Sequence, residues 1–386
     1  MSVSIKYKGT EIASASTEVT KTIKTAGKYC EADILVKNTP DGGGGVEPPV
    51  LPDDEGYVYI TLYPSENPQR INMLFNAAID PKIEYGLLKN GVFNSIGILY
   101  DETGTKSENS LLLEIPEYND YLVVKCRMTN ASRCYSASGS LRSSNPSIYE
   151  FHYNLTKAEV GANMYLFYPS AKRLTISKEI VFSGYMQTDA FNECKCDELI
   201  INGCNKISDN NIKLPNPRIC SLRNYKYNNG IGGMGNTFSG NTELYKLDIT
   251  GSILNTTTSI SGVFNYCYRL KDLNLSDCNM SGVTNTSNTF AHCYNLINIT
   301  TNSNTIFPAV SFGLPESQYL SNNSLVNIAN ALPVVEAAQT LALHATPKDR
   351  LATIMGAVAD GVFTADASGT VTLENFITQT KGWTVA

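Results

Sequence analysis

The sequence predicts a mixed, mainly β fold in three parts: a small N-terminal β module, a β-sandwich, and a solenoid of repeats closed by an α/β cap. Three observations lead to this prediction. A glycine- and proline-rich segment divides the chain near residue 50, short β-rich runs with polar turns follow it, and several apolar positions then recur at one regular interval. We expect five segments, at residues 1–38, 39–55, 56–130, 131–309 and 310–386.

Residues 1–38 alternate polar and apolar side chains as short strands do. We expect strands at residues 4–9, 20–25 and 32–36, and because so short a unit buries little core, we expect it to depend on a partner or an oligomer. The linker at 39–55 carries four consecutive glycines from residue 42 and three prolines between residues 48 and 52. Glycine makes its first half flexible and proline stiffens its second half.

Residues 56–130 contain four β-rich runs separated by polar turns, at 57–63, 95–100, 110–115 and 121–126. Short strands at this spacing are typical of a β-sandwich. Residues 117–124, Glu-Tyr-Asn-Asp-Tyr-Leu-Val-Val, resemble the final hairpin of PKD-type, immunoglobulin-like modules. That resemblance implies an immunoglobulin-like sandwich for this segment.

The repeat is the most specific signal in the chain. Three sets of apolar residues each recur at the same constant interval: Phe238, Phe264 and Phe290; Leu244, Leu270 and Leu296; Leu247, Leu273 and Ile299. Each copy should form a short strand with alternate residues facing inward, and the strands should stack into a parallel sheet with one continuous core. A cysteine or asparagine should lie inside at each turn. We expect earlier strand positions of the same kind at Leu174, Leu199 and Leu222.

The C-terminal segment changes in character. Residues 324–332 have a helical apolar period, residues 340–343 read as a strand, and Thr346-Pro347 predicts the start of a helix through Val358. Further strands are expected at 371–373 and 383–385. We interpret this segment as a cap that seals the open end of the sheet.

Composition excludes several classes of protein. The chain has 30 Lys and Arg against 36 Asp and Glu, which gives a formal net charge of −6. This charge argues against binding to nucleic acid or to anionic lipid. The sequence contains no run of about 18 apolar residues, so we expect no transmembrane helix. Residues 1–9 lack the apolar core and cleavage site of a secretory signal, so we expect none.

No motif for phosphate, dinucleotide, zinc-protease or α/β-hydrolase chemistry is present in the sequence. Among ten cysteines, Cys194 and Cys196 lie too close together for a zinc site, so we expect mostly reduced core cysteines. His292, on the turn of a repeat, should have a surface or packing role. Asp189 and Glu193 could form a carboxylate pair for glycoside cleavage, but two solvated acids on a loop fit better. We therefore predict no catalytic residue, no cofactor and no metal site.

The second half of the repeat region resembles the leucine-rich repeats of bacterial surface proteins called BspA-like. Six residues match that pattern one for one: Phe264, Cys267, Leu270, Leu273, Leu275 and Ser276. Val283-Thr284-Asn285 matches the pattern further on, and Phe290 and Cys293 match the next copy. The resemblance covers residues 162–306 and implies that residues 131–309 form a leucine-rich-repeat solenoid, with an α/β cap after it.

A second resemblance lies at the N-terminus. Residues 21–34 read Lys-Thr-Ile-Lys-Thr-Ala-Gly-Lys-Tyr-Cys-Glu-Ala-Asp-Ile, which is similar to a module at the start of phage and prophage tail proteins. Residues 340–386 are similar to the ending of such proteins. The resemblance implies that residues 1–38 attach to phage tail or baseplate proteins, and that the chain is a homo-oligomer, often a trimer in such tail parts.

The sequence therefore favours a non-enzymatic phage tail fibre or receptor-binding protein that contacts a bacterial surface protein or glycan through its repeats. It would be assembled in the host cytoplasm and located in the virion tail. The alternatives are a bacterial cell-surface leucine-rich-repeat adhesin and a tail-associated polysaccharide-degrading enzyme. The candidate receptor-binding residues, on the exposed sheet face and beside it, are Lys246, Asp248, Thr250, Asp272, Asn274, Ser276, Asn298, Thr300, Tyr245, Tyr268 and Tyr294.

Overall fold

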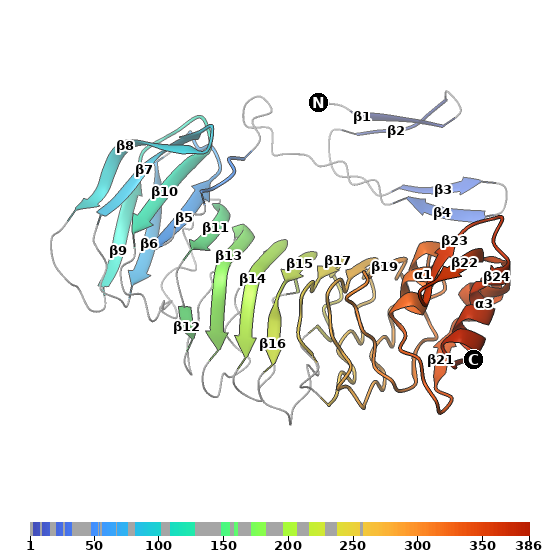
Figure 1. The fold of residues 1–386 in the computed structure, drawn as a ribbon. Coiled ribbons are helices and arrows are strands. Elements are labelled where there is room, and N and C mark those ends of the chain that lie inside the picture. Colours follow the sequence, from blue (N-terminus) through green and yellow to red (C-terminus); the bar gives the residue numbers. More distant parts are fainter. Residues whose placement is uncertain are drawn as a thin grey trace.

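Figure 1 shows the fold of the chain as a computed structural model. The structure describes the strands β1 to β4 within residues 3–32 and then residues 48–52, 54, 56–66, 68–75, 82–101, 109–127, 148–154, 158–160, 171–182, 196–206, 216–227, 238–254 and 258–386. The described chain is mainly β with few helices and contains a β-solenoid of about five turns, which agrees with the coarse class predicted from the sequence.

The N-terminal strands form two antiparallel pairs: β1 (Val3–Tyr7) with β2 (Thr10–Ala15), and β3 (Lys21–Thr25) with β4 (Lys28–Ala32). The expected strands at 4–9 and 20–25 correspond closely to β1 and β3, whereas β2 was not predicted. Most of the strand expected at 32–36 lies outside the described residues.

The segment at 56–130 contributes antiparallel strands in the order β8–β7–β10–β5 and a separate pair β6–β9. Their bounds are β5 (Tyr57–Leu62), β6 (Gln69–Phe75), β7 (Lys82–Lys89), β8 (Val92–Asp101), β9 (Asn109–Ile115) and β10 (Leu122–Arg127). The four predicted runs correspond to β5, β8, β9 and β10, and the sequence reasoning missed β6 and β7. Val58, Ile60 and Leu62 of β5 point into the buried core.

The main sheet continues from these strands into the solenoid without a break. β11 (Ile148–Asn154) pairs antiparallel with β5 on one side and parallel with β13 on the other. The strands from β11 onward then stack in parallel (Figure 1). Their bounds are β12 (Ala158–Val160), β13 (Ala171–Phe182), β14 (Glu198–Lys206), β15 (Ile219–Leu222), β16 (Tyr225–Tyr227), β17 (Lys246–Asp248), β18 (Asp272–Asn274) and β19 (Asn298–Thr300).

The register confirms most of the predicted strand positions and corrects one. Leu174 lies beside Leu199, and Leu247 lies beside Leu273, which lies beside Ile299. In the coil between them, however, Cys220 occupies the strand position, since it pairs with both Leu199 and Leu247. The prediction of Leu222 there was wrong by two positions. Because the side-chain period of a strand is two, both residues face the core, and the apolar pattern alone could not separate them.

Backbone hydrogen bonds link neighbouring coils around their whole circumference. The N–H groups of several residues in one coil each donate to the carbonyl of the residue just before the matching position of the next coil: Ile249, Gly251, Leu254, Ile260, Gly262, Phe264 and Tyr266. Isolated parallel bridges join Ile253 to Asn279 and Ser259 to Asn285. The stack thus satisfies its backbone groups between coils, as a solenoid must.

Ladders of identical side chains fill the inside of the coils. The rings of Phe238, Phe264 and Phe290 stack at centroid distances of 5.8 Å and 5.1 Å and are buried. Cys267, Cys278 and Cys293 are also buried, and each thiol donates to a carbonyl of the preceding coil at 3.0–3.1 Å. The prediction of inward cysteines at the turns is confirmed for these residues, whereas the stacking of the rings was not predicted.

The C-terminal segment mixes short strands and helices. The parallel strands are β20 (Phe312–Leu314), β21 (Thr340–Leu343) and β25 (Thr384–Val385), and the antiparallel strands are β22 (Met355–Ala359), β23 (Val362–Ala365) and β24 (Val371–Thr372). The helices are α1 (Asn322–Ala331), α2 (Ala345–Arg350) and α3 (Leu373–Asn375), with a 3₁₀ turn at Leu351–Thr353 and a π-helical turn at Phe376–Thr380.

Helix α1 closes the sheet at β19. The hydroxyl of Ser324 accepts the N–H of Ile299 at 2.8 Å and donates to the carbonyl of Ile297 at 2.8 Å. The amide nitrogen of Asn327 donates to the carbonyl of Ile299 at 2.8 Å. Side chains of the helix therefore replace the hydrogen bonds of the next strand, which is the sealing role that the sequence predicted.

The helix predicted from Thr346 through Val358 was wrong in both its start and its end. His344 is the N-cap of α2, because its ring accepts the N–H of Thr346, and the helix stops at Arg350. Residues 355–365 instead form a hairpin. Its turn is at Asp360-Gly361, whose φ angles of 51° and 74° are the left-handed values that a tight hairpin turn requires.

Candidate binding surface

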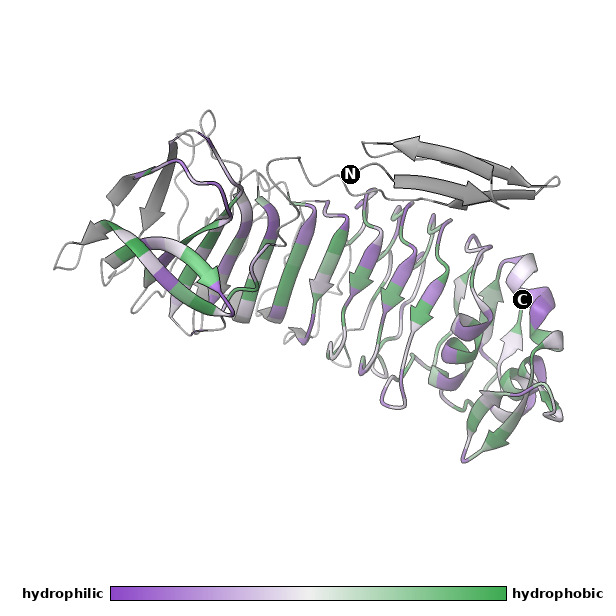
Figure 2. Cartoon of the chain, turned by 90° about the horizontal axis from the view of Figure 1, so that it is seen from above, coloured by the Kyte–Doolittle hydropathy of each residue, from purple (hydrophilic) through white to green (hydrophobic). Residues whose placement is uncertain are grey.

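The strand face of the solenoid carries two in-register rows of side chains. Lys246, Asp272 and Asn298 lie side by side on β17, β18 and β19, and Asp248, Asn274 and Thr300 form the second row. Figure 2 shows how hydrophilic and hydrophobic residues alternate along these strands. Lys246, Asn298 and Thr300 are exposed, and Asp272 and Asn274 are half-buried. The amide of Asn298 donates to Asp272 at 2.6 Å.

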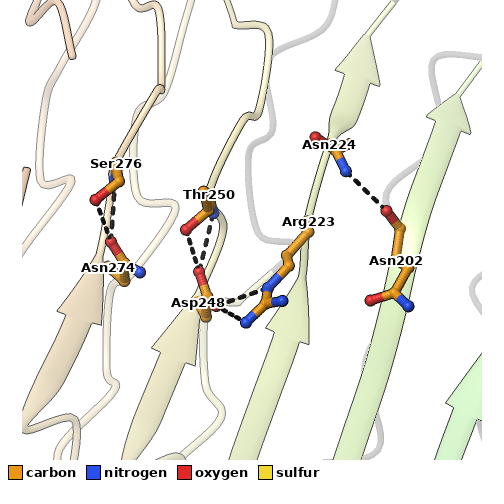
Figure 3. Close-up of polar contacts among 7 residues, drawn as sticks. All are labelled: Asn202, Arg223, Asn224, Asp248, Thr250, Asn274 and Ser276. Atoms are coloured by element: carbon orange, nitrogen blue, oxygen red, sulfur yellow. Dashed lines mark hydrogen bonds and ion pairs between the residues drawn. The ribbon is translucent and has the colours of Figure 1, made fainter. Parts of the chain in front are cut away.

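Asp248 departs from the expected exposed position, because only 8% of its surface is accessible. One carboxylate oxygen accepts from Nε of Arg223 at 2.8 Å and pairs with its terminal nitrogen at 2.7 Å (Figure 3). The other accepts from the N–H of Thr250 at 3.1 Å and from its hydroxyl. Burial raises the pKa of Asp248, but the hydrogen bonds from Thr250 and Arg223 outweigh it and hold the pKa below its usual value. Asp248 and Thr250 therefore fasten the end of β17.

The next coil repeats this arrangement with neutral residues. The side-chain oxygen of Asn274 accepts from the N–H of Ser276 at 3.1 Å and from its hydroxyl at 2.8 Å (Figure 3). In the preceding coils Asn224 ties two strands together by donating to the carbonyl of Asn202 at 3.0 Å. Thr250, Asn274 and Ser276, which the sequence placed in the binding surface, thus form local hydrogen bonds at the ends of their own strands.

The three predicted tyrosines separate into two places. Tyr245 is half-buried, and its hydroxyl accepts from the ammonium of Lys271 at 2.9 Å. Tyr268 and Tyr294 are exposed and stack with a centroid distance of 6.0 Å and an interplanar angle of 3°. The structure therefore brings Tyr268 and Tyr294 together and gives Tyr245 a partner of its own.

Two more rings join this stacked pair. Tyr266 and His292 stack at 4.5 Å and 17°, and Tyr266 meets Tyr268 edge-on at 5.9 Å. The side chains of Tyr266, Tyr268, His292 and Tyr294 form what we call the ring cluster. Sequence reasoning missed Tyr266 and assigned His292 only a surface or packing role. The constant repeat interval that leads from Gly240 to Tyr266 to His292 was the signal that could have found them.

The polar groups of the ring cluster converge on Glu316. Nδ1 of His292 lies 2.7 Å from the hydroxyl of Tyr294 and 3.2 Å from the Glu316 carboxylate, which also accepts the backbone N–H of His292. Partial desolvation and then the charge of Glu316 raise the pKa of Tyr294 above its ordinary value. The cluster thus combines flat apolar rings with a hydroxyl, an imidazole and a carboxylate.

A second charged group lies further back along the first row of the same face. Arg173 on β13 pairs with Glu198 on β14 at 2.8 Å and with Glu150 on β11 at 3.6 Å. Burial raises the pKa of Glu150, although its hydrogen bond from Thr175 and the charge of Arg173 act in the opposite direction. These contacts join three neighbouring strands, and we assign the group to the sheet rather than to a binding site.

The remaining candidates fall as follows. His152 is buried beside Tyr59 with ring centroids 6.3 Å apart, and His344 caps α2. Asp189, Glu193 and Cys194 lie outside the described residues. Of the helices that the structure describes, none is long and apolar enough to cross a membrane. Comparison of the chain with protein-family models, with curated proteins and with solved structures found no match.

Proposed function

We propose that this chain is a non-enzymatic receptor-binding component of a phage tail, and that it contacts a bacterial surface receptor through its solenoid. The observation that carries the proposal is that exposed polar side chains and an exposed group of aromatic rings lie on consecutive coils of the solenoid. The exposed strand-face residues Lys246, Asn298 and Thr300 lie in register, and the ring cluster precedes the same strands, with Tyr268 shortly before Asp272 in the chain.

Such a surface suits recognition for a physical reason. Tyrosines supply large contact area at little cost in conformational entropy, and polar residues around them supply hydrogen bonds. The closed hydrogen-bond network at Asp248 and Asn274 fixes the strands beneath, so the exposed side chains are presented on a rigid support. Rigid presentation lowers the ordering cost of binding.

The proposal assigns the other segments by the sequence resemblances. Residues 1–38 would attach to tail or baseplate proteins, residues 39–55 would give reach, and residues 56–130 would form an immunoglobulin-like sandwich before BspA-like leucine-rich repeats. A homotrimer in the virion tail would present three copies of the surface. Several weak contacts made at once raise the overall strength of attachment by orders of magnitude.

The test is binding of the purified full-length chain to intact cells across a panel of gut bacteria, with its mass measured by light scattering in the same preparation. We expect binding restricted to some strains, a trimer in solution, and no release of sugar from the cells. Binding to no strain, together with a monomer, would remove the support for a receptor-binding tail protein. Release of sugar would instead point to a polysaccharide-degrading enzyme.

A further inference from the structure

Left-handed backbone positions recur in the coils and form three columns, each of which contains a glycine, and in the first of them Asn224 precedes Gly251. In the first, Gly251 is followed by Asp277 at the matching position of the next coil, and in the second Gly262 is followed by Asn288. In the third, Gly240 is followed by Tyr266 and then by His292, with φ angles of 76°, 60° and 61°. All three columns require a left-handed backbone conformation, but only the third has residues with aromatic rings at these positions.

Tyr266 opposes the local backbone preference at this position, whereas His292 is of a residue type that is enriched at left-handed positions. Asparagine and aspartate tolerate the left-handed conformation because their short polar side chains can bond locally, whereas a tyrosine there is strained. Core burial does not repay the strain, since 43% of the surface of Tyr266 remains exposed. Residues that keep such strain without a packing reason gather at functional sites.

The two left-handed positions have a clear geometric consequence. They place Tyr266 and His292 against Tyr268 and Tyr294, so that two stacked pairs lie side by side across two coils. Tyr266, Tyr268 and Tyr294 are 43%, 39% and 41% exposed. The carboxylate of Glu316 and the hydroxyl of Tyr294 belong to the same group of side chains. Arg269 follows Tyr268 in the chain and forms an ion pair with Glu243 at 2.9 Å.

We propose that the ring cluster is a saccharide subsite that takes a pyranose ring of a bacterial surface glycan. A pyranose has one face of C–H groups, which packs on an aromatic ring, and a rim of hydroxyls, which need donors and acceptors. The cluster offers both within one patch. Arg269 pairs with Glu243, and Glu316 lies beside His292, so positive and negative charges are mixed here, which suits a neutral sugar better than a polyanion. The inference rests on the proposed function for the source of the glycan.

The column of Gly240, Tyr266 and His292 suggests a specific set of variants. Tyr266→Gly and His292→Gly each restore the residue type that Gly240 shows at this position, so they remove a ring while the backbone conformation becomes easier. Asn288→Gly is the matched control, because it makes the same kind of change at a left-handed position that follows Gly262 and carries no ring. Circular dichroism and thermal unfolding of all three verify the fold.

The probe is protein-free polysaccharide, prepared by protease treatment from the strains of the cell panel, and binding of the full-length chain to it is measured on a biosensor. We expect the unaltered chain to bind polysaccharide from at least one strain, Tyr266→Gly and His292→Gly each to lose at least about tenfold in affinity, and Asn288→Gly to match the unaltered chain. Tyr268→Ala should lose affinity in the same way.

Two results would overturn the inference. If the chain binds none of the polysaccharides, the cluster is not a saccharide subsite, and binding to intact cells then decides separately whether the receptor-binding function survives with a protein receptor. If the chain binds a polysaccharide but the glycine variants bind as well as the Asn288→Gly control, the saccharide site lies elsewhere on the molecule.

Discussion

Cys267, Cys278 and Cys293 share one hydrogen-bonding rule. Each thiol donates to a carbonyl of the preceding coil, and each N–H donates to a carbonyl of its own turn. Thr289 follows the same rule with its hydroxyl. A buried carbonyl at each turn therefore receives one bond from its own coil and one from the next coil. A small side chain with a hydrogen-bond donor is needed at these positions, and this need explains the cysteines without metal or disulfide chemistry.

This account predicts that the three thiols resist chemical modification. Burial raises the pKa of Cys267 and of Cys278 to about 12 and raises that of Cys293 well above its usual value. Because the thiolate is the reactive form, alkylation of these sites at mildly alkaline pH should be at least about a hundredfold slower in the folded chain than in urea. Mass spectrometry of the labelled peptides measures this, and fast labelling in native buffer would show that the turns are open.

Asp248 predicts a specific pH dependence of stability. Its folded-state pKa lies below the ordinary value of 3.8, so the stabilisation from its charge is complete above that value and is lost as the pH falls through the folded pKa. Asp248→Asn keeps an acceptor for Thr250, as Asn274 does for Ser276, and removes the charge opposite Arg223. We expect it to lower the free energy of unfolding by about 1 kcal/mol at neutral pH.

Urea unfolding of both proteins from neutral pH down to about pH 3 tests the sign of this effect. The difference between the two free energies should begin to shrink as the pH falls below 3.8, because the unfolded carboxylate is protonated first, and it should vanish only below the folded-state pKa. A difference that stays constant across the whole range would mean that the carboxylate charge contributes nothing. Asn274→Asp is the converse variant, at the same position of the next coil but without a direct arginine partner among its described contacts.

At the scale of elements, α1 ends the sheet by side-chain hydrogen bonds. Ser324→Ala leaves the N–H of Ile299 without its acceptor in a buried place, which should lower the free energy of unfolding by about 1–3 kcal/mol. Amide hydrogen exchange should become faster in β19 and stay unchanged in β22 and β23. An exposed substitution on the same helix, Asn323→Ala, is the control. Unchanged exchange in β19 after Ser324→Ala would mean that α1 does not protect this edge.

The sequence was most informative where identical residues lie on top of each other. The constant repeat interval identified Phe264, Leu273 and Ile299 because a ladder requires the same kind of side chain in each coil. It was less informative where the coil length changes, so Leu222 was taken for the strand position that Cys220 holds. The helix past Arg350 was overpredicted because the start signal at Thr346-Pro347 does not fix where a helix ends, although the Asp360-Gly361 turn signal was in the sequence.

The binding surface was predictable only in part for a related reason. Alternation places side chains on the outer face of a strand, and it placed Lys246, Asn298 and Thr300 correctly. Alternation does not show which side chains of a neighbouring coil contact that face, so the ion pair that Arg223 forms with Asp248 was not predicted. The ring cluster is formed by side chains on the turns of neighbouring coils, and the alternation of residues along strands does not predict contacts between turns.

At the scale of the whole molecule, one sheet connects the antiparallel strands to the solenoid through β5 and β11. The backbone of Phe151 pairs with Ile60 on one side and with Leu174 on the other. A chain that begins at residue 148 would expose the unpaired backbone and the buried side chains of this strand at an open edge, so we expect it to aggregate or to lose several kcal/mol of stability. A chain that begins at residue 48 keeps the described pairing and should remain well folded. Size-exclusion chromatography and thermal unfolding compare the two, and a stable, well-dispersed 148–386 would show that the solenoid folds independently.

The central claim is that the receptor meets the repeats at the ring cluster and the adjoining strand face. The most direct measurement is amide hydrogen exchange of the full-length chain with and without cell-wall fragments from a strain that it binds. The account predicts slower exchange in residues 264–276 and 290–300 on binding, with residues 355–372 of the cap unchanged. Protection confined to residues 57–127, with none in 264–300, would contradict the account and move recognition to the antiparallel strands.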